Sequence, residues 1–541
     1  MLEVLQLILF LAAVIPLSYY ISNLFIEEKP LLQPYLGWLE NLCYKCGGVD
    51  PHVEMYWKTY GKTLLIFNLL GFFFLFIIQL LQGYLPLNPE HFPNIPWALA
   101  FNTTASFITN TNWQAYAGET TLSYFTQMVG LTSQNFLSAA TGLSALLVLI
   151  RGLSRNAIDS VGNFWRDLTK SIVYLFLPLS ILFSLFLVSQ GVIQTFSPYV
   201  TLTTLENRKQ TIPLGPVASQ VAIKQLGTNG GGFFNANSAH PFENPTPLSN
   251  IFEMLAILLI PSATALAYGR MIGSPKEGKH TFIVMLTLWL IGCGLSFFIE
   301  EGWEGKETRI GISSSLLWFI STTATSNGSI NASLSSFSPL STGIALINMK
   351  LGEVIFGGVG VGLCSMLMYM ILTVFMSGLM VGRTPEYLGK KIEKKEMQWV
   401  IIAILFPSAL ILMGSSYVAA SLTDIKNPHE LTKILYTFAS TAENNGSSLG
   451  MNVDTPFYHL ILGFIMLLGR TSIILPTLAI GGLLARKKII PNSKGTLSTS
   501  SWIFGLMLIG SIIIVGGLTF FPSLALGPIL DYFLIQEGKF Y

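Results

Sequence analysis

Four short clusters of Asn, Thr, Ser and Gly interrupt a chain that is otherwise mostly apolar. They read Thr109-Asn-Thr-Asn-Trp-Gln114, Gly227-Thr-Asn-Gly-Gly-Gly232, Thr325-Ser-Asn-Gly-Ser329 and Glu443-Asn-Asn-Gly-Ser447. A dehydrated alkali cation needs oxygen atoms in place of its hydration shell, and backbone carbonyls can provide them. Turning successive carbonyls to one side requires left-handed backbone conformations, which Gly adopts freely and Asn more readily than most residues. The clusters therefore favour a binding site for a monovalent cation.

The clusters recur at a regular spacing. Aligning Asn112, Gly230, Gly328 and Gly446 gives intervals of 118, 98 and 118 residues. A single such cluster is typical of an ordinary polar turn, but four in register behind short apolar segments predict four equivalent units around one pore. Each short segment should direct its negative carboxyl end toward a cation at the centre. These expected half-helices are Trp97–Ile108, Val217–Leu226, Ser314–Thr323 and Glu430–Ser440.

The elements that must position these clusters are membrane-spanning helices. Only 11% of the 541 residues are charged and 51% are apolar, whereas soluble proteins carry about 25% charged residues. Apolar segments of about 20 residues predict transmembrane helices, so we expect an all-α polytopic membrane protein. The ten expected spans are Leu2–Phe25, Leu64–Leu85, Leu122–Ile150, Ser171–Phe196, Leu248–Tyr268, Thr281–Glu300, Ser341–Met380, Trp399–Leu422, Pro456–Leu484 and Ser500–Leu524.

Lys and Arg residues predict the orientation of these spans. Alternate connections contain twenty of them on one side and eight on the other, while Lys350 and Arg470 fall inside spans. The positive-inside rule then places the basic connections in the cytoplasm and both termini outside. The net charge of +2 is small and its residues are scattered, which argues against nucleic-acid binding.

At its polar clusters the sequence resembles a known family. Four stretches carry the resemblance: Gly227 to Thr246, the cluster 109–114, Gly352-Glu-Val-Ile-Phe-Gly-Gly-Val-Gly360 and Gly382-Arg-Thr-Pro-Glu-Tyr-Leu-Gly-Lys-Lys391. They are similar to the potassium-binding (A) subunit of the bacterial Kdp potassium-transporting ATPase. The resemblance extends over essentially the whole chain. It implies the channel-like fold of the superfamily of potassium transporters, with ten helices and four pore units.

The resemblance also implies which residues form the potassium filter. They are Asn110, Thr111, Asn112, Gln114, Thr228, Asn229, Gly230, Ser326, Asn327, Gly328, Asn444, Asn445 and Gly446. Glu443 departs from the neutral Asn expected there, and it either adds a cation-attracting charge or faces loop structure. Lys350 also looks unusual for the family.

The seventh span is too long for one tilted helix and contains five glycines between Gly352 and Gly362. Gly is unfavourable in a helix interior, so a break is predicted, although a glycine-rich packing face is the alternative. In the family this stretch obstructs the cytoplasmic exit, which implies a gating loop with Gly357, Gly358, Gly360 and Gly362. A charge at the centre of a span is costly unless it is paired or hydrated. We therefore hypothesise that Glu353 and Arg470 pair beneath the filter, the alternative being an unpaired Arg470 hydrated in the cavity.

The chain lacks the Asp-Lys-Thr-Gly and G-x-x-x-x-G-K-[ST] motifs, so we expect no ATP hydrolysis and no cofactor in this chain. Potassium is its substrate, and ATP and magnesium belong to the partner implied by the resemblance, a P-type ATPase subunit accompanied by small accessory membrane chains. The expected location is the bacterial inner membrane, in contact with lipid. The alternative function is a stand-alone potassium channel or cation symporter of the same superfamily, which would need an open path to the cytoplasm.

These expectations divide the chain into six parts. They are an extra helix and cytoplasmic loop at 1–62, pore unit 1 at 63–155, pore unit 2 at 156–275, pore unit 3 with a broken second helix at 276–390, pore unit 4 at 391–490, and a final extra helix at 491–541.

Overall fold

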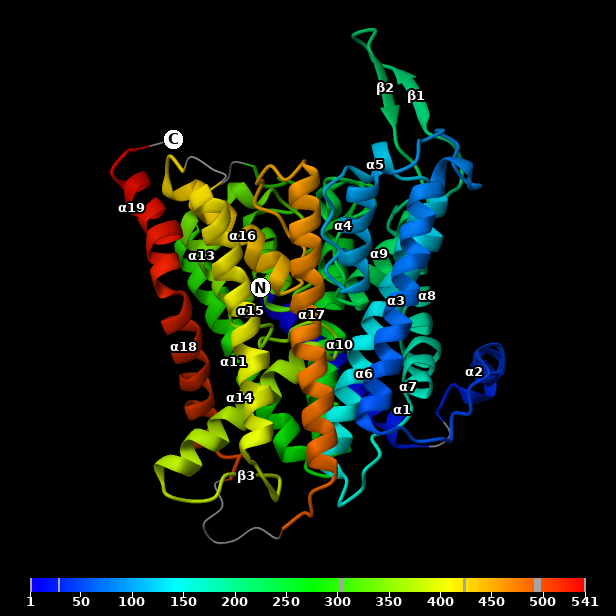
Figure 1. The fold of residues 1–541 in the computed structure, drawn as a ribbon. Helices are drawn as coiled ribbons and strands as arrows, with labels where there is room; N and C mark the ends of the chain where they lie inside the picture. The colour runs from blue at the N-terminus through cyan, green and yellow to red at the C-terminus, as the bar shows by residue number, and fades with distance from the viewer. Residues whose placement is uncertain (1, 28–29, 301–304, 422–424, 491–497, 540–541) are drawn as a thin grey trace.

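The computed structural model describes residues 2–27, 30–300, 305–421, 425–490 and 498–539. Within these ranges, ten helical segments are long and apolar enough to cross a membrane, as predicted. Figure 1 shows them standing side by side in one bundle. They are α1 (Leu2–Ile26), α3 (Trp57–Leu81), α6 (Ser133–Ser154) with the π-helical turn η2 (Thr126–Thr132), α7 (Phe164–Lys170) continued by η3 (Ser171–Phe176) and α8 (Leu177–Ser189), α10 (Pro247–Met271), α11 (Pro275–Ile299), α14 (Val361–Met380), α15 (Lys394–Ser421), α17 (Pro456–Ala485), and α18 (Trp502–Leu524) continued by η6 (Ala525–Ile529) and α19 (Leu530–Gln536).

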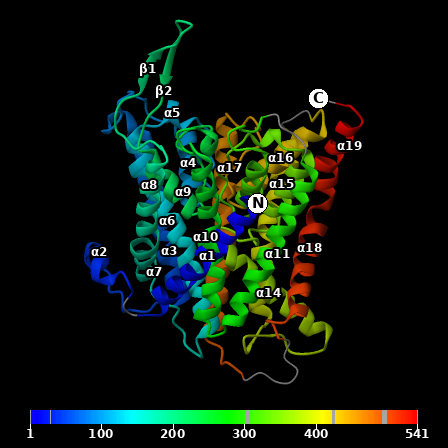
Figure 2. The same cartoon turned by 180° about the vertical axis from the view of Figure 1, so that it is seen from behind.

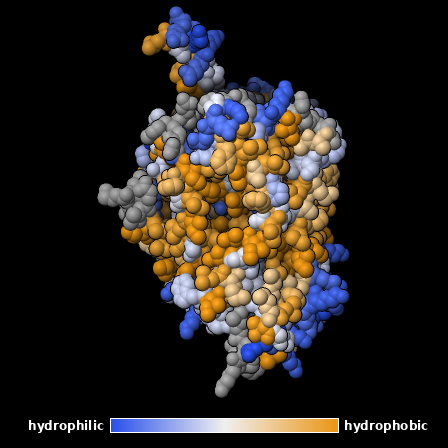
Figure 3. Space-filling view, turned by 90° about the vertical axis from the view of Figure 1, so that its left-hand side faces the viewer, coloured by the Kyte–Doolittle hydropathy of each residue, from blue (hydrophilic) through white to orange (hydrophobic). Residues whose placement is uncertain are grey.

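An apolar belt surrounds the bundle. Figure 3 shows hydrophobic residues over the middle of one face, with hydrophilic residues gathered toward the two ends. Large apolar side chains are exposed on peripheral helices, among them Leu182 on α8 and Leu506 on α18. Since helices satisfy their own backbone hydrogen bonds, they can present such a surface to lipid.

Burial separates an inner from an outer helix in each predicted unit. In each helix that follows a polar cluster, the most apolar 18-residue stretch is largely buried. The buried share of that stretch is 83% for the α6 segment, 72% for α10, 67% for α14 and 61% for α17. The helices that precede the clusters are more exposed, at 22% for the α3 segment, 39% for α7–α8, 44% for α11 and 33% for α15. The central axis is therefore lined by the second helix of every unit.

Four short helices precede the polar clusters, as predicted. They are α4 (Trp97–Ile108), α9 (Val217–Leu226), α12 (Ile312–Ala324) and α16 (Pro428–Ala442). The first two have the predicted bounds, and the other two extend slightly further at both ends. In α16 the earlier start has a local cause, because Asn427 caps the helix by accepting a hydrogen bond from the Glu430 amide and Pro428 occupies its first turn. Figure 1 shows α4, α9 and α16 in the same half of the bundle.

The seventh span is broken, as predicted. α13 (Pro339–Lys350) ends inside the bundle and α14 begins at Val361, with residues 351–360 forming no helix. Glu353 and Phe356 adopt φ values of 57° and 49°, which is uncommon for residues with a side chain and incompatible with a continuous helix. The close-packed helical face considered as an alternative is therefore wrong for this stretch.

The remaining elements lie at the two ends or on the periphery. They are α2 (Gln33–Gly47), α5 (Gly118–Thr121), the 3-10 turns η1 (Gln82–Tyr84), η4 (Asn237–Ala239) and η5 (Leu334–Ser336), and the antiparallel hairpins β1–β2 (Val200–Thr203 and Lys209–Ile212) and β3–β4 (Glu386–Tyr387 and Lys390–Lys391). Figures 1 and 2 show β1–β2 projecting from the end of the bundle nearer the short helices, and Figure 2 shows α1 running along α10.

Candidate cation filter

Each of the four short helices leads into a loop with the same backbone conformation. In every loop the first and third residues of a three-residue stretch have positive φ. These pairs are Asn110 and Asn112, Thr228 and Gly230, Ser326 and Gly328, and Asn444 and Gly446. An alternation of this kind turns neighbouring carbonyl groups to one side. Gly or Asn, which adopt positive φ most readily, occupies six of these eight positions, and Thr228 and Ser326 occupy the other two.

The four loops contact one another in a closed ring. A Cβ atom added to Gly230 would overlap the carbonyl oxygen of Asn327 in the next loop. The same holds for Gly328 against Asn445 of the fourth loop and for Gly446 against Thr111 of the first loop. Side-chain contacts between the first and second loops complete the circle. The loops therefore surround one axis at a common level.

Hydrogen bonds between loops fix this arrangement. In the first loop, Asn110 and Asn112 each donate from Nδ2 to a carbonyl oxygen of the second loop, at Thr228 and Gly230, over 2.9 Å. Gln114 donates to the Gly232 carbonyl oxygen (2.9 Å) and accepts from its amide (2.8 Å).

The third and fourth loops are each bonded to the short helix of the preceding unit, and the fourth loop is also bonded to the first. Asn327 Nδ2 donates to the Lys224 carbonyl oxygen (3.0 Å) and Asn445 Nδ2 to that of Thr322 (2.9 Å). Asn444 Nδ2 donates to Thr111 Oγ1 over 2.9 Å. The asparagine side chains thus act mainly as braces between loops.

The carbonyl group before each aligned position is in the same state in all four loops. Within the described residues, no hydrogen bond reaches the carbonyl oxygens of Thr111, Asn229, Asn327 and Asn445, each of which directly precedes an aligned position. Buried carbonyl groups normally have partners, and three of these four instead pack against the aligned glycine of the preceding loop in the ring. Four unengaged oxygens at one level are suited to replace the hydration shell of a potassium ion.

The broken segment 351–360 is attached to the second loop. Thr228 Oγ1 accepts a 2.8 Å hydrogen bond from the Val359 amide and donates one of 2.8 Å to the Gly227 carbonyl oxygen. Glu353 turns back on its own segment, where its carboxylate accepts from the Gly358 amide over 3.1 Å. A Cβ on Gly360 would overlap Gly142 of α6, so the segment packs closely against the inner helices.

Glu353 and Arg470 are both buried, but no ion pair within 4.0 Å joins them among the described residues. Arg470 Nη2 has no hydrogen-bond partner there. The direct bridge that we hypothesised is therefore absent among the described residues.

Lys350 and Glu443 line one small cavity. Lys350 Nζ donates to Ser523 Oγ over 3.0 Å and lies 4.8 Å from the centre of the Phe520 ring. Glu443 is buried, and its Oε2 has no hydrogen-bond partner in the part of the chain that the structure describes. The cavity has a volume of about 10 Å³, which suffices for one water molecule or an ion of similar size.

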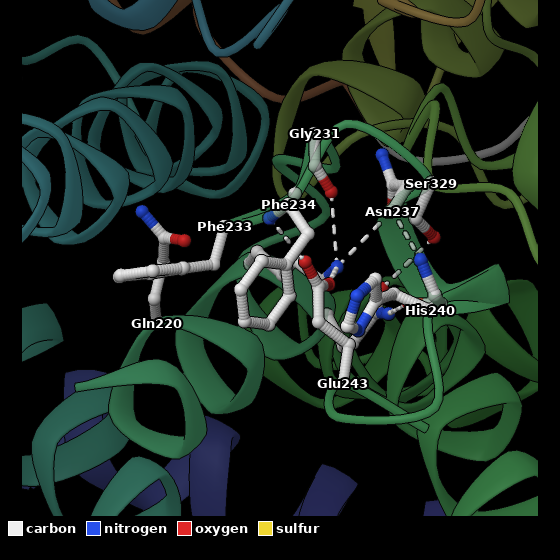
Figure 4. A network of polar contacts seen from close by, with 12 residues as sticks. Gln220, Gly231, Phe233, Phe234, Asn237, His240, Glu243 and Ser329 are labelled. Carbon is white, nitrogen blue, oxygen red and sulfur yellow. Dashed lines mark hydrogen bonds and ion pairs between the residues drawn. The ribbon is translucent and has the colours of Figure 1, made fainter. Parts of the chain in front are cut away.

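A buried polar network behind the second loop was missed by sequence reasoning. Lys224 of α9 forms an ion pair with Glu243, and both side chains are inaccessible to solvent. Glu253 of α10 is also fully buried and accepts hydrogen bonds from Gln225 (3.0 Å) and Ser238 (3.1 Å). Figure 4 shows the part of this network around Glu243, Asn237 and Gly231. The sequence feature that could have revealed this network is Lys224, a charged residue inside a ten-residue helix at membrane depth. We counted it only among the basic residues of the connections.

Comparison with known proteins agrees with this architecture. The model of the family described as potassium-transporting ATPase A subunit matches residues 4–533. Proteins named potassium-transporting ATPase potassium-binding subunit are 51% identical over 519 residues in Leptospira interrogans serovar copenhageni (92% of this chain and 93% of the relative) and 50% identical over 556 residues in Pseudomonas aeruginosa (98% of each).

A solved structure shares the fold. The crystal structure of the potassium transporter TrkH from Vibrio parahaemolyticus matches with a TM-score of 0.53 and 15% identity, over 87% of this chain and 96% of that chain. The family model, in contrast, matches nearly the full sequence, and the named relatives are about 50% identical to this chain. The chain belongs to the potassium-transporting ATPase A subunit family.

Proposed function

We propose that this protein binds potassium in the four-loop filter and passes it to a P-type ATPase subunit of an ATP-driven uptake complex. The observation that carries the proposal is the ring of four unengaged carbonyl oxygens at Thr111, Asn229, Asn327 and Asn445. Neutral oxygens favour a weakly hydrated monovalent cation, whereas divalent cations prefer carboxylates. The names of the relatives support potassium as the ion.

The energy for uptake comes from the partner in this proposal. The sequence contains no phosphorylatable Asp-Lys-Thr-Gly and no phosphate-binding loop, so ATP and magnesium are bound by the ATPase subunit, and small accessory membrane chains complete the complex. The attachment of segment 351–360 to Thr228 supports a closed path directly beneath the filter. A closed path fits lateral transfer to a partner better than a stand-alone channel or symporter.

The complex resides in the bacterial inner membrane, with the filter and both termini outside. The excess of Lys and Arg in alternate connections supports this orientation.

Potassium flux in proteoliposomes tests the proposal. The chain alone should not conduct, and the chain co-purified with its ATPase subunit should take up potassium only with MgATP. Gly230→Asp should sharply lower the apparent potassium affinity of that uptake, because the new side chain overlaps the Asn327 carbonyl. Rapid flux through the chain alone would instead establish the channel function.

A further inference from the structure

The last turn of α9 differs from the equivalent turns of the other short helices by one charge. Lys224 lies six residues before the aligned Gly230, where the other units have Ser106, Thr322 and Ser440. Its side chain is only 1% exposed. An ammonium group in such a place is costly unless its three N–H donors are all satisfied.

All three donors of Lys224 have acceptors. Nζ lies 3.0 Å from the Gly231 carbonyl oxygen and 3.1 Å from Asn237 Oδ1, and it forms an ion pair with Glu243. Glu243 is held in turn, because its other carboxylate oxygen accepts from the Phe234 amide over 2.8 Å. Figure 4 shows Gly231, Asn237 and Glu243 converging on this point.

The backbone of the same lysine holds the inner part of the filter. Its carbonyl oxygen accepts hydrogen bonds from the amides of Asn229 (2.9 Å) and Gly230 (3.1 Å), and from Asn327 Nδ2 of the third loop (3.0 Å). Asn229 and Asn327 carry two of the four unengaged carbonyl oxygens. Lys224 therefore holds the second loop through both its side chain and its backbone carbonyl, and the same carbonyl contacts the third loop.

The third and fourth units achieve a related attachment without charge. Trp318 Nε1 donates to the Ser329 carbonyl oxygen over 2.9 Å, and the hydroxyls of Tyr436 and Ser447 are 2.8 Å apart. Ser329 and Ser447 directly follow the aligned glycines, as Gly231 does. Only the second unit uses an ammonium group for this attachment, among the described residues at these equivalent positions.

We propose that Lys224 is a positioning residue that sets the potassium affinity and ion selectivity of the filter by anchoring the Gly231 carbonyl, with Glu243 holding the ammonium in place. The inference rests on the proposed function of the filter. A charge-assisted bond is stronger than a neutral one, so it holds the second loop at a fixed distance from the axis. Selectivity between ions of similar radius depends on such fixed distances or on the strength of the coordinating dipoles.

The test compares potassium and rubidium binding by calorimetry, using the purified full-length chain in lipid nanodiscs. The double variant Lys224→Met with Glu243→Gln removes the anchor without leaving an isolated buried charge. We expect its potassium dissociation constant to rise at least about tenfold, or about 1.4 kcal/mol, and the ratio of rubidium to potassium affinity to move toward one. Ser106→Ala is the matched control, since none of the described residues forms a hydrogen bond with the Ser106 hydroxyl, and it should bind both ions like the wild type.

Glu243→Asp is a milder second variant, which retains the charge pair but shortens the carboxylate. It should change the rubidium-to-potassium ratio in the same direction, whereas a purely structural role would lower the melting temperature and leave that ratio unchanged. If either variant folds and binds both ions with wild-type affinity and ratio, the inference is overturned. Failure of the proposed function is a different result, in which the wild type and Ser106→Ala bind no potassium at all.

Discussion

Asn112 Nδ2 donates a 2.9 Å hydrogen bond to the carbonyl oxygen of Gly230, the residue aligned with it 118 positions later. The bonds from Asn110 to Thr228 and from Gln114 to Gly232 have the same offset. The 118-residue spacing seen in the sequence thus corresponds to direct contacts between two neighbouring units. These contacts make the first and second loops dependent on each other.

Asn112→Ala should weaken potassium binding. It removes the bond to Gly230 and a second bond of 2.9 Å to Asn135 Oδ1, which leaves buried acceptors unpaired at about 1–3 kcal/mol each. We expect the potassium dissociation constant, measured by calorimetry, to rise about tenfold or more. Asn235→Ala is the control, because that side chain is exposed on the segment that follows the second cluster. Equal affinities in the two variants would contradict the bracing role.

Gly328→Ala should impair the filter far more than the same change at Gly382. Both glycines have positive φ, at 83° and 70°, so each alanine meets a backbone penalty of about 1–2 kcal/mol. At Gly328 the methyl group also overlaps the Asn445 carbonyl oxygen, whereas at Gly382 nothing lies within 4 Å. We expect loss of high-affinity potassium binding only for Gly328→Ala. Normal binding by that variant would mean that the loops are less closely packed than the ring requires.

Thr228→Val should allow potassium to leak through the chain. The change removes the acceptor for the Val359 amide, and an unpaired buried N–H costs about 1–3 kcal/mol. Segment 351–360 should then open more often. Potassium flux from proteoliposomes containing the chain alone measures this effect. Thr228→Ser retains the hydroxyl and should remain tight, and an equally tight valine variant would show that this bond does not hold the segment closed.

Glu443→Gln should lower the apparent potassium affinity several-fold. The carboxyl group is buried beside the fourth loop, and no described residue donates a hydrogen bond to its Oε2. Burial disfavours the charged form of this group, and a potassium ion entering nearby would offset that cost, so the ion and the carboxylate should stabilise each other. Steady-state uptake by the complete complex at varied potassium concentration gives the value. The control is Glu206→Gln on the exposed β1–β2 hairpin, and an identical affinity in both variants would exclude a contribution from the Glu443 charge.

Much of the architecture could be predicted because it depends on local sequence. Long apolar segments form spanning helices whatever their neighbours, and the short helices α4 and α9 have the predicted bounds. The break after Lys350 follows from the local density of glycine. Glu253 shows the limit of such reasoning: it lies near the outer end of its span and suggests an interfacial position, yet it is fully buried against Gln225 and Ser238.

The sequence by itself determined the helices, the four aligned clusters and the break in the seventh span, because each depends on residues close together in the chain. Tertiary structure alone decided which carbonyl oxygens remain unengaged, that Lys224 reaches Gly231 and Glu243, and that Glu353 and Arg470 stay apart. The physical reason is that a side-chain contact within about 3 Å depends on the rotation and depth of each helix. Packing among all the helices sets those quantities, and no single segment encodes them.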